Sequence, residues 1–146
     1  MAPRFQLTFD CADPDRQAHF WAEALGYTIE DPPAGFETWD AYWRSVGVPE
    51  EELDGGDDSI VDPDGAGPRI WFQKVPEGKV VKNRIHFDVN AGGGRSVPLA
   101  TRKERVEAEV TRLVALGATR RHTLGSGLDH YAVAMVDPEG NEFDVH

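Results

Sequence analysis

Apolar and polar residues alternate near the start of the chain, and the same alternation returns in its second half. Residues 4–10 read RFQLTFD and residues 83–89 read NRIHFDV. Successive side chains of a strand point to opposite faces, so this pattern predicts two strands that each have one apolar and one polar face. Both segments carry a Phe-Asp pair, Phe9-Asp10 and Phe87-Asp88, which marks the start of an internal repeat.

A helix is predicted after each of these strands. In the first half, Asp13 suits the N-cap, Pro14 suits the first helical position, and Gly26 suits the left-handed residue that ends the helix. The second half repeats the final Ala-Leu-Gly at Gly117. An apolar helical stripe precedes it, made of Val106, Val110, Leu113 and Val114.

Each half continues with further strands and an Asp-Pro-x-Gly turn. The strands are predicted at 27–30, 59–62 and 68–75 in the first half, and at 118–123, 130–136 and 141–145 in the second. The turns are VDPDG at 61–65 and VDPEG at 136–140. Asp at the first position, Pro at the second and Gly at the fourth favour a type I turn that closes a hairpin.

This order of elements predicts an α+β fold built from two βαβββ modules. Module one spans about 1–76, with an insertion at about 36–57, and module two spans about 83–146. We expect a single domain in which two curved mixed sheets pair around a central cleft, with the helices on the outer faces. Function is expected in that cleft, because its walls are the polar faces of the strands.

Composition narrows the expected partners. The chain of 146 residues carries 26 acidic and 15 basic residues, for a net charge of −11. This charge argues against nucleic acid and anionic membranes as partners. Cys11 is the only cysteine, so no disulfide can form within the chain. No apolar run resembles a signal core or a membrane span, and we therefore expect a cytoplasmic protein.

Four polar residues are candidates for a site because the period of two places them on the polar strand faces. They occupy equivalent positions of the two modules: Thr8, Gln73, His86 and Asp144. His and Asp are ligands that divalent cations accept, and Gln can offer a carbonyl oxygen. A polar groove that holds only water fits the same pattern. His130 begins a predicted strand that borders the cleft.

The insertion carries an aromatic helical face. Phe36, Trp39, Trp43 and Val46 follow one another at spacings of three, four and three, which indicates a short helix. This face can pack on the sheet, the interpretation we favour for Phe36 and Val46. It can also form a lid in which Trp39 and Trp43 make an aromatic wall beside Trp71, suited to flat, apolar or cationic small molecules.

The paired modules, the NRIHFDV strand and the closing DPEGNEFDV resemble the vicinal oxygen chelate superfamily. This group includes glyoxalase I, bleomycin-resistance proteins, fosfomycin-resistance enzymes and extradiol dioxygenases. The likeness is greatest to its small bacterial glyoxalase-like domains, and residues 70–89, IWFQKVPEGKVVKNRIHFDV, are the most specific stretch. The resemblance covers nearly the whole chain, and the insertion is its least specific part.

The resemblance implies a metal site whose ligands come from the first and last strands of each module. His86 matches the first-strand ligand of module two, and Asp144 occupies the last-strand position where Glu is usual. Gln73 matches the last-strand position of module one, while Thr8 stands where His or Gln is usual. The implied cofactor is a divalent metal, either Zn, Ni, Mn or Fe, or else none.

The resemblance also implies a small-molecule ligand, and two kinds of function stay open. One is a metal-assisted lyase, isomerase or oxygenase that acts on an oxygenated organic molecule. The other is a metal-free protein of the bleomycin-resistance type that sequesters an aromatic or cationic molecule. A homodimer is expected, with the modules pairing either within one chain or across the dimer.

Overall fold

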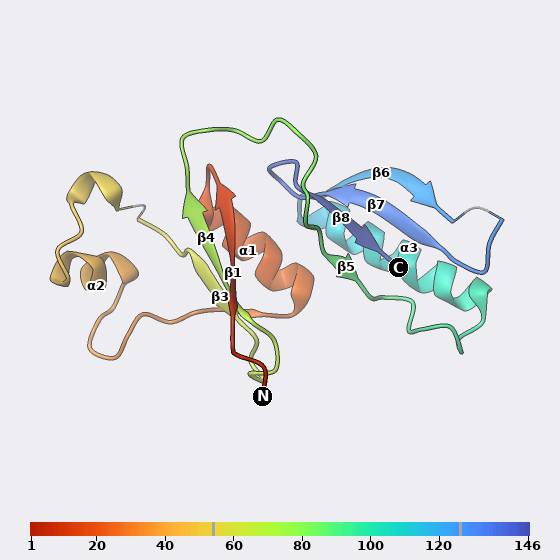
Figure 1. The fold of residues 1–146 in the computed structure, drawn as a ribbon, viewed down its shortest axis with the longest axis horizontal. Helices are drawn as coiled ribbons and strands as arrows, with labels where there is room; N and C mark the ends of the chain where they lie inside the picture. Colours follow the sequence, from red (N-terminus) through yellow and green to blue (C-terminus); the bar gives the residue numbers. More distant parts are fainter. Residues whose placement is uncertain (54, 126) are drawn as a thin grey trace. The chain divides into compact units, whose positions relative to one another are not determined.

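The computed structural model describes residues 1–53, 55–125 and 127–146 (Figure 1). Asp54, which belongs to the predicted insertion, and Ser126, which precedes His130, lie outside the described residues. The chain divides into two compact units, Met1–Gly78 and Lys79–His146. The pairing of two modules into one domain around a cleft stays a prediction.

The first unit contains a four-stranded mixed sheet in the order β1-β4-β3-β2, in which β1 and β4 are parallel and the other pairs antiparallel. The helix α1 packs against β3 and β4 of this sheet (Figure 1). The elements are β1 (Gln6–Cys11), α1 (Pro14–Leu25), β2 (Thr28–Ile29), α2 (Trp39–Ser45), the short 3-10 helix η1 (Glu50–Glu52), β3 (Ser59–Val61) and β4 (Arg69–Lys74).

The ends of α1 are those that the sequence predicts. The Asp13 carboxylate accepts a hydrogen bond from the Arg16 backbone N–H at 3.1 Å, and Gly26 takes the left-handed conformation with a φ of 70°. Beneath α1, the ring of Phe9 contacts the edges of Trp21 and Phe72. The apolar faces of β1 and β4 therefore point to the helix, which leaves their polar faces for a site.

The second unit repeats this plan with the sheet order β5-β8-β7-β6, in which β5 and β8 are parallel. The helix α3 packs against β6, β7 and β8 (Figure 1). Its elements are β5 (Asp88–Val89), α3 (Leu99–Leu116), β6 (Thr119–Leu124), β7 (Ala132–Val136) and β8 (Glu142–Val145). The buried core includes Val106, Val110, Leu113, Val133, Met135, Phe143 and Val145. The predicted α+β class with two mixed sheets is confirmed.

The two Asp-Pro-x-Gly segments form matching turns. The Gly65 N–H donates to the Asp62 carbonyl oxygen and the Gly140 N–H donates to the Asp137 carbonyl oxygen, both at 2.9 Å. The Asp62 carboxylate also accepts backbone N–H groups of Asp64 and Gly67, and these bonds lower its pKa. Each Asp therefore closes its turn with both backbone and side chain.

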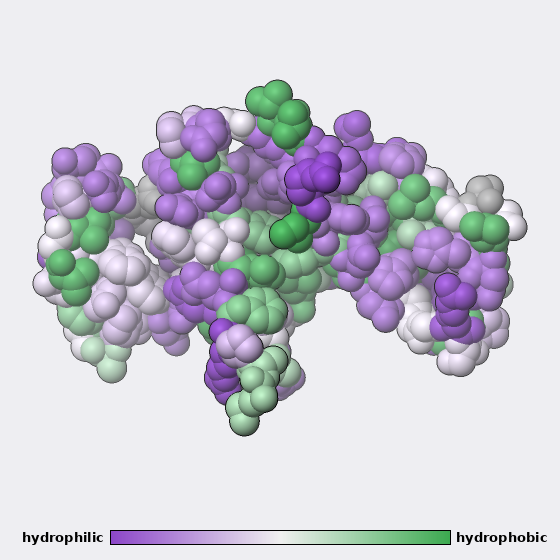
Figure 2. Space-filling model, in the orientation of Figure 1, coloured by the Kyte–Doolittle hydropathy of each residue, from purple (hydrophilic) through white to green (hydrophobic). Residues whose placement is uncertain are grey.

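Some predicted positions of apolar residues are wrong. Phe5 and Ile85, which the alternation assigned to the helix side, are 69% and 81% exposed. Phe5 precedes β1, and regular pairing in β5 begins only at Asp88, so neither residue lies where a helix covers the sheet. Figure 2 shows apolar side chains exposed at several places on a mostly polar surface.

Two further residues of the predicted apolar helical faces are also exposed. Val114 lies outside the buried stripe of α3, which runs through Arg102, Val106, Val110 and Leu113. Val46 ends α2 and is exposed, so the predicted packing of this valine on the sheet is wrong. Phe36 is half-buried and meets the ring of Tyr42. Among the described helices, none is long and apolar enough to cross a membrane.

Candidate functional site

Three side chains on the polar face of the second sheet converge at one point. His86 Nε2 lies 3.5 Å from Asp88 Oδ1 and 3.6 Å from Asp144 Oδ2. Asp88 and Asp144 are register partners in the parallel pair β5–β8, so their side chains leave the sheet on the same face. His86 precedes Asp88 by two residues and reaches the same side. The alternation puts Asp88 on the same polar face as His86, but Asp88 was not among the predicted ligands.

This cluster has the donor atoms of a cation site. One imidazole nitrogen and two carboxylate oxygens lie within 4.8 Å of one another. Asp144 is 26% exposed while the other two side chains are more open, so an ion can enter from solvent. Imidazole nitrogen and carboxylate oxygen together suit Zn²⁺, Mn²⁺, Fe²⁺ or Ni²⁺. The residues present therefore fit a divalent transition ion.

Glu142 secures the segment that carries His86. Its carboxylate accepts the Asn83 backbone N–H at 2.9 Å and the Lys79 ammonium at 2.9 Å. The Asn83 side chain also donates to Asn141 at 3.0 Å. Burial by itself would raise the pKa of Glu142, but the Asn83 N–H and the Lys79 ammonium outweigh it and lower the pKa to about 2. The strand β5 has only two residues, so these hydrogen bonds fix the position of the segment that precedes it and carries His86.

Thr8 and Gln73 lie on the polar face of the first sheet. In the parallel pair β1–β4, Thr8 is the register partner of Trp71 and Asp10 that of Gln73. Both Thr8 and Gln73 are exposed. The first unit therefore repeats the arrangement of the second with an amide and a hydroxyl in place of a carboxylate and an imidazole. The grouping of Thr8 and Gln73 with His86 and Asp144 in one site stays a prediction.

The first unit also contains a pocket of about 650 Å³. Trp39 and Trp43 of α2 line it together with Trp71 and Gln73 of β4. Trp39, Trp43 and Trp71 are the three tryptophans that the sequence predicts as an aromatic wall. The size lies within the range of about 300–1,000 Å³ that is typical of small-molecule sites.

Hydrogen bonds and stacking place the three indole rings. Trp39 stacks on Trp43 with ring centroids 5.7 Å apart and an interplanar angle of 25°. Trp39 Nε1 donates to the Glu30 carbonyl oxygen at 2.9 Å, and Trp71 Nε1 donates to the Asp58 carboxylate at 3.2 Å. The polar ring atoms of Trp39 and Trp71 thus have protein partners, which leaves mainly apolar ring surface for a ligand.

The pocket carries more negative than positive charge. Its lining includes four acidic residues, Asp40, Glu51, Glu52 and Asp58, and one basic residue, Lys74. Such a lining attracts cations and repels anions. Sequence reasoning missed these carboxylates, although the acidic run at 50–52 was visible beside the aromatic helix.

His130 lies in a loop of the second unit. The strand β7 begins at Ala132, two residues later than predicted, and His130 is exposed. A side chain at Gly125 would meet the His130 ring and backbone within 3 Å, so the two loop segments approach closely. Among the described residues, the His86 cluster does not include His130.

Comparisons with known proteins agree with this fold. A family model described as "Glyoxalase-like domain" matches residues 6–146, and no curated protein matches the chain. A possible glyoxalase from Bacillus cereus has 15% identity and a TM-score of 0.58, with 99% of this chain and 98% of that one covered. A glyoxalase/bleomycin resistance protein/dioxygenase family enzyme from Burkholderia phytofirmans PsJN has 17% identity and a TM-score of 0.56, with 96% and 94% covered.

A mutant of the fosfomycin resistance protein FosX from Listeria monocytogenes is also similar. It was solved with Mn(II) and 1S,2S-dihydroxypropylphosphonic acid. Its identity to this chain is 12% and the TM-score is 0.60, with 100% of this chain and 90% of that one covered. At these identities the structural likenesses show a shared fold alone.

Proposed function

The chain belongs to the glyoxalase-like domain family, and we propose that it binds a small organic cation with an aromatic or apolar body in the tryptophan-lined pocket of its first unit. The observation that carries this proposal is the presence of three tryptophans and four carboxylates on one pocket of about 650 Å³. Aromatic ring faces attract cations, by about 0.5–1 kcal/mol at exposed sites and about 2 kcal/mol when water is excluded. The carboxylates add attraction for the same charge.

The charge of the pocket sets the ligand class. An anion would meet the carboxylates of Asp40, Glu51 and Glu52 with only the Lys74 ammonium to balance them. A neutral apolar molecule could use the rings but would gain nothing from the carboxylates. A cation of aromatic or branched apolar shape uses both, which agrees with the sequestering function that the family resemblance left open.

Tryptophan fluorescence tests this proposal directly. Benzyltrimethylammonium, its neutral carbon isostere neopentylbenzene, and the anion benzoate would each be titrated into the full chain. We expect a saturable change with benzyltrimethylammonium, a weaker one with neopentylbenzene and none with benzoate. Trp43→Ala should weaken the response. Phe5→Ala should not, because Phe5 is an exposed aromatic residue that does not line the pocket. Equal affinity for all three probes would contradict the proposal.

A metal-assisted reaction is the second candidate, and the convergence of His86, Asp88 and Asp144 favours it. These three residues would hold the ion, which as a Lewis acid would polarise a carbonyl or enediolate oxygen of the substrate. Glu142, through Asn83, would keep the segment that carries His86 in place. The reaction type would then be that of a lyase, isomerase or oxygenase.

Metal content separates this candidate from simple binding. Protein purified without a histidine tag would be assayed for bound metal beside His86→Ala and Asp144→Ala, with His122→Ala, an exposed strand histidine, as the control. Loss of one equivalent of metal in both site variants, with no loss in the control, would support the metal-assisted function. A His86 cluster that takes up no divalent ion on titration would refute it.

The expected homodimer, which the family resemblance implies, and the expected cytoplasmic location, which rests on sequence composition, also remain proposals. Light scattering in solution tests the dimer, which would have twice the chain mass of 16.1 kDa. A mass of one chain at every concentration would contradict it.

A further inference from the structure

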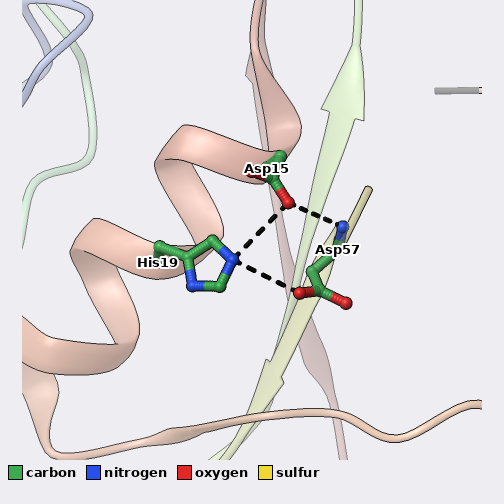
Figure 3. A group of neighbouring side chains, drawn as sticks. All are labelled: Asp15, His19 and Asp57. Carbon is green, nitrogen blue, oxygen red and sulfur yellow. Dashed lines mark hydrogen bonds and ion pairs between the residues drawn. The ribbon is translucent and has the colours of Figure 1, made fainter. Parts of the chain in front are cut away.

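A second cluster of metal-ligating side chains lies in the first unit, where two residues of α1 meet one residue of the insertion. His19 Nε2 is 3.5 Å from Asp15 Oδ1 and 3.3 Å from Asp57 Oδ2 (Figure 3). Asp15 and His19 are four residues apart on one helix, so they share a face. Asp57 comes from the end of the insertion and lies beside them (Figure 3). None of the functions described above uses these residues.

Backbone contacts, and not side chains alone, bring Asp57 to the helix. The Asp57 N–H donates to Asp15 Oδ1 at 2.9 Å. The preceding residue, Gly56, comes so close that a Cβ atom there would lie 2.7 Å from the same oxygen and 2.9 Å from Asp15 Cβ. Only glycine permits this approach without a shift. The meeting of the three donors is therefore part of the local fold.

The distances suit one bound ion. Zinc ligands lie about 2.0–2.2 Å from the metal, so two ligands at the tetrahedral angle are about 3.4 Å apart. The two separations from His19 Nε2, 3.5 and 3.3 Å, are close to that value. All three donor atoms lie within 4.8 Å of one another, and the side chains are half-exposed, so an ion and its remaining water ligands have access.

We propose that Asp15, His19 and Asp57 bind one divalent transition ion of the zinc class, with water completing the coordination. The imidazole favours Zn²⁺ and its neighbours over Ca²⁺ and Mg²⁺, which prefer oxygen ligands alone. The ion neutralises two adjacent carboxylates. It also ties the end of the insertion, which carries Trp39 and Trp43, to α1.

Zinc titration of the full chain in a His86→Ala/Asp144→Ala background tests the proposal, because that background removes the other cluster. Calorimetry should find one equivalent of Zn²⁺, and Co²⁺ in its place should show visible absorption bands of a low-symmetry site. His19→Ala added to this background should abolish both signals. Asp57→Asn keeps the backbone N–H bond to Asp15 and should weaken binding by at least tenfold. Ca²⁺ should not compete.

His122→Ala is the matched control, because His122 is an exposed histidine outside both clusters. This variant should still bind one equivalent of Zn²⁺. Thermal unfolding followed by circular dichroism shows whether each variant is folded, and His19→Gln replaces His19→Ala if the latter is not. Absence of zinc binding in the background chain, or its retention after loss of the His19 imidazole, would overturn the proposal. The fluorescence titration of the tryptophan pocket does not depend on this result, so the two proposals can fail separately.

Discussion

Asp144 stands opposite Asp88 in the parallel pair β5–β8, as Gln73 stands opposite Asp10 in β1–β4. The internal repeat therefore extends to individual positions on the polar sheet faces. The difference lies in chemistry, because the second unit adds an imidazole and a second carboxylate where the first has Thr8 and Gln73. This explains why the three-donor cluster is found on the second sheet.

Restoring these donors should create a cation site on the first sheet. Thr8→His with Gln73→Asp would repeat the spacing of His86, Asp88 and Asp144 around Asp10. We expect one further equivalent of Zn²⁺ relative to the parent chain, measured by calorimetry. Gln6→His with Gln73→Asp puts the imidazole two residues too far along β1 and should add none. An equal gain in both double variants would show that register does not decide the site.

Zinc should stabilise the second unit through the His86 cluster. In a His19→Ala chain, free Zn²⁺ at about a hundredfold above its Kd should add about 2.7 kcal/mol to the free energy of unfolding. That is a rise of several degrees in Tm, measured by differential scanning calorimetry. Asp144→Asn should remove most of the rise, and His122→Ala should keep it. An unchanged rise in Asp144→Asn would exclude Asp144 as a ligand.

The carboxylates of the pocket should affect only charged ligands. The double variant Glu51→Gln/Glu52→Gln should weaken the binding of benzyltrimethylammonium by a few fold, since each exposed charge contributes up to about 1 kcal/mol. Binding of neopentylbenzene should not change. The loss should shrink as salt is added, because salt screens exposed charges. Glu37→Gln, an exposed residue outside the pocket lining, is the control. A similar loss for both ligands would mean that the double variant has altered the pocket shape.

Glu142 should make the free energy of unfolding fall as the pH is lowered into the acid range. Its pKa falls from the ordinary 4.5 to about 2 in the folded protein, with burial opposing the fall and the Asn83 N–H and Lys79 ammonium producing it. A lowered pKa contributes stability above pH 4.5, and this contribution is lost as the pH falls toward 2. Glu142→Gln should cost about 1 kcal/mol at neutral pH. Urea unfolding from pH 7 to pH 2 should show the two proteins converging; a constant difference would contradict this assignment.

Much of the fold could be predicted because its signals are local. The cap at Asp13, the left-handed Gly26 and the paired Asp-Pro-x-Gly turns depend on residues a few positions apart, and the structure confirms them. Alternation also assigned the polar faces of β1 and β8 correctly. It failed for Phe5 and Ile85, since alternation continues past the point where a strand stops pairing and a helix stops covering it.

The candidate sites divide in the same way. The sequence by itself predicted His86 and Asp144 as metal ligands, and it placed Trp39 and Trp43 on one helical face. Only the tertiary structure paired Asp88 with Asp144 and placed acidic residues in the lining of the pocket that holds the indole rings. It also brought Asp57 to His19, across 38 residues of sequence. The physical reason is that register and loop closure depend on contacts between distant segments, which no local spacing encodes.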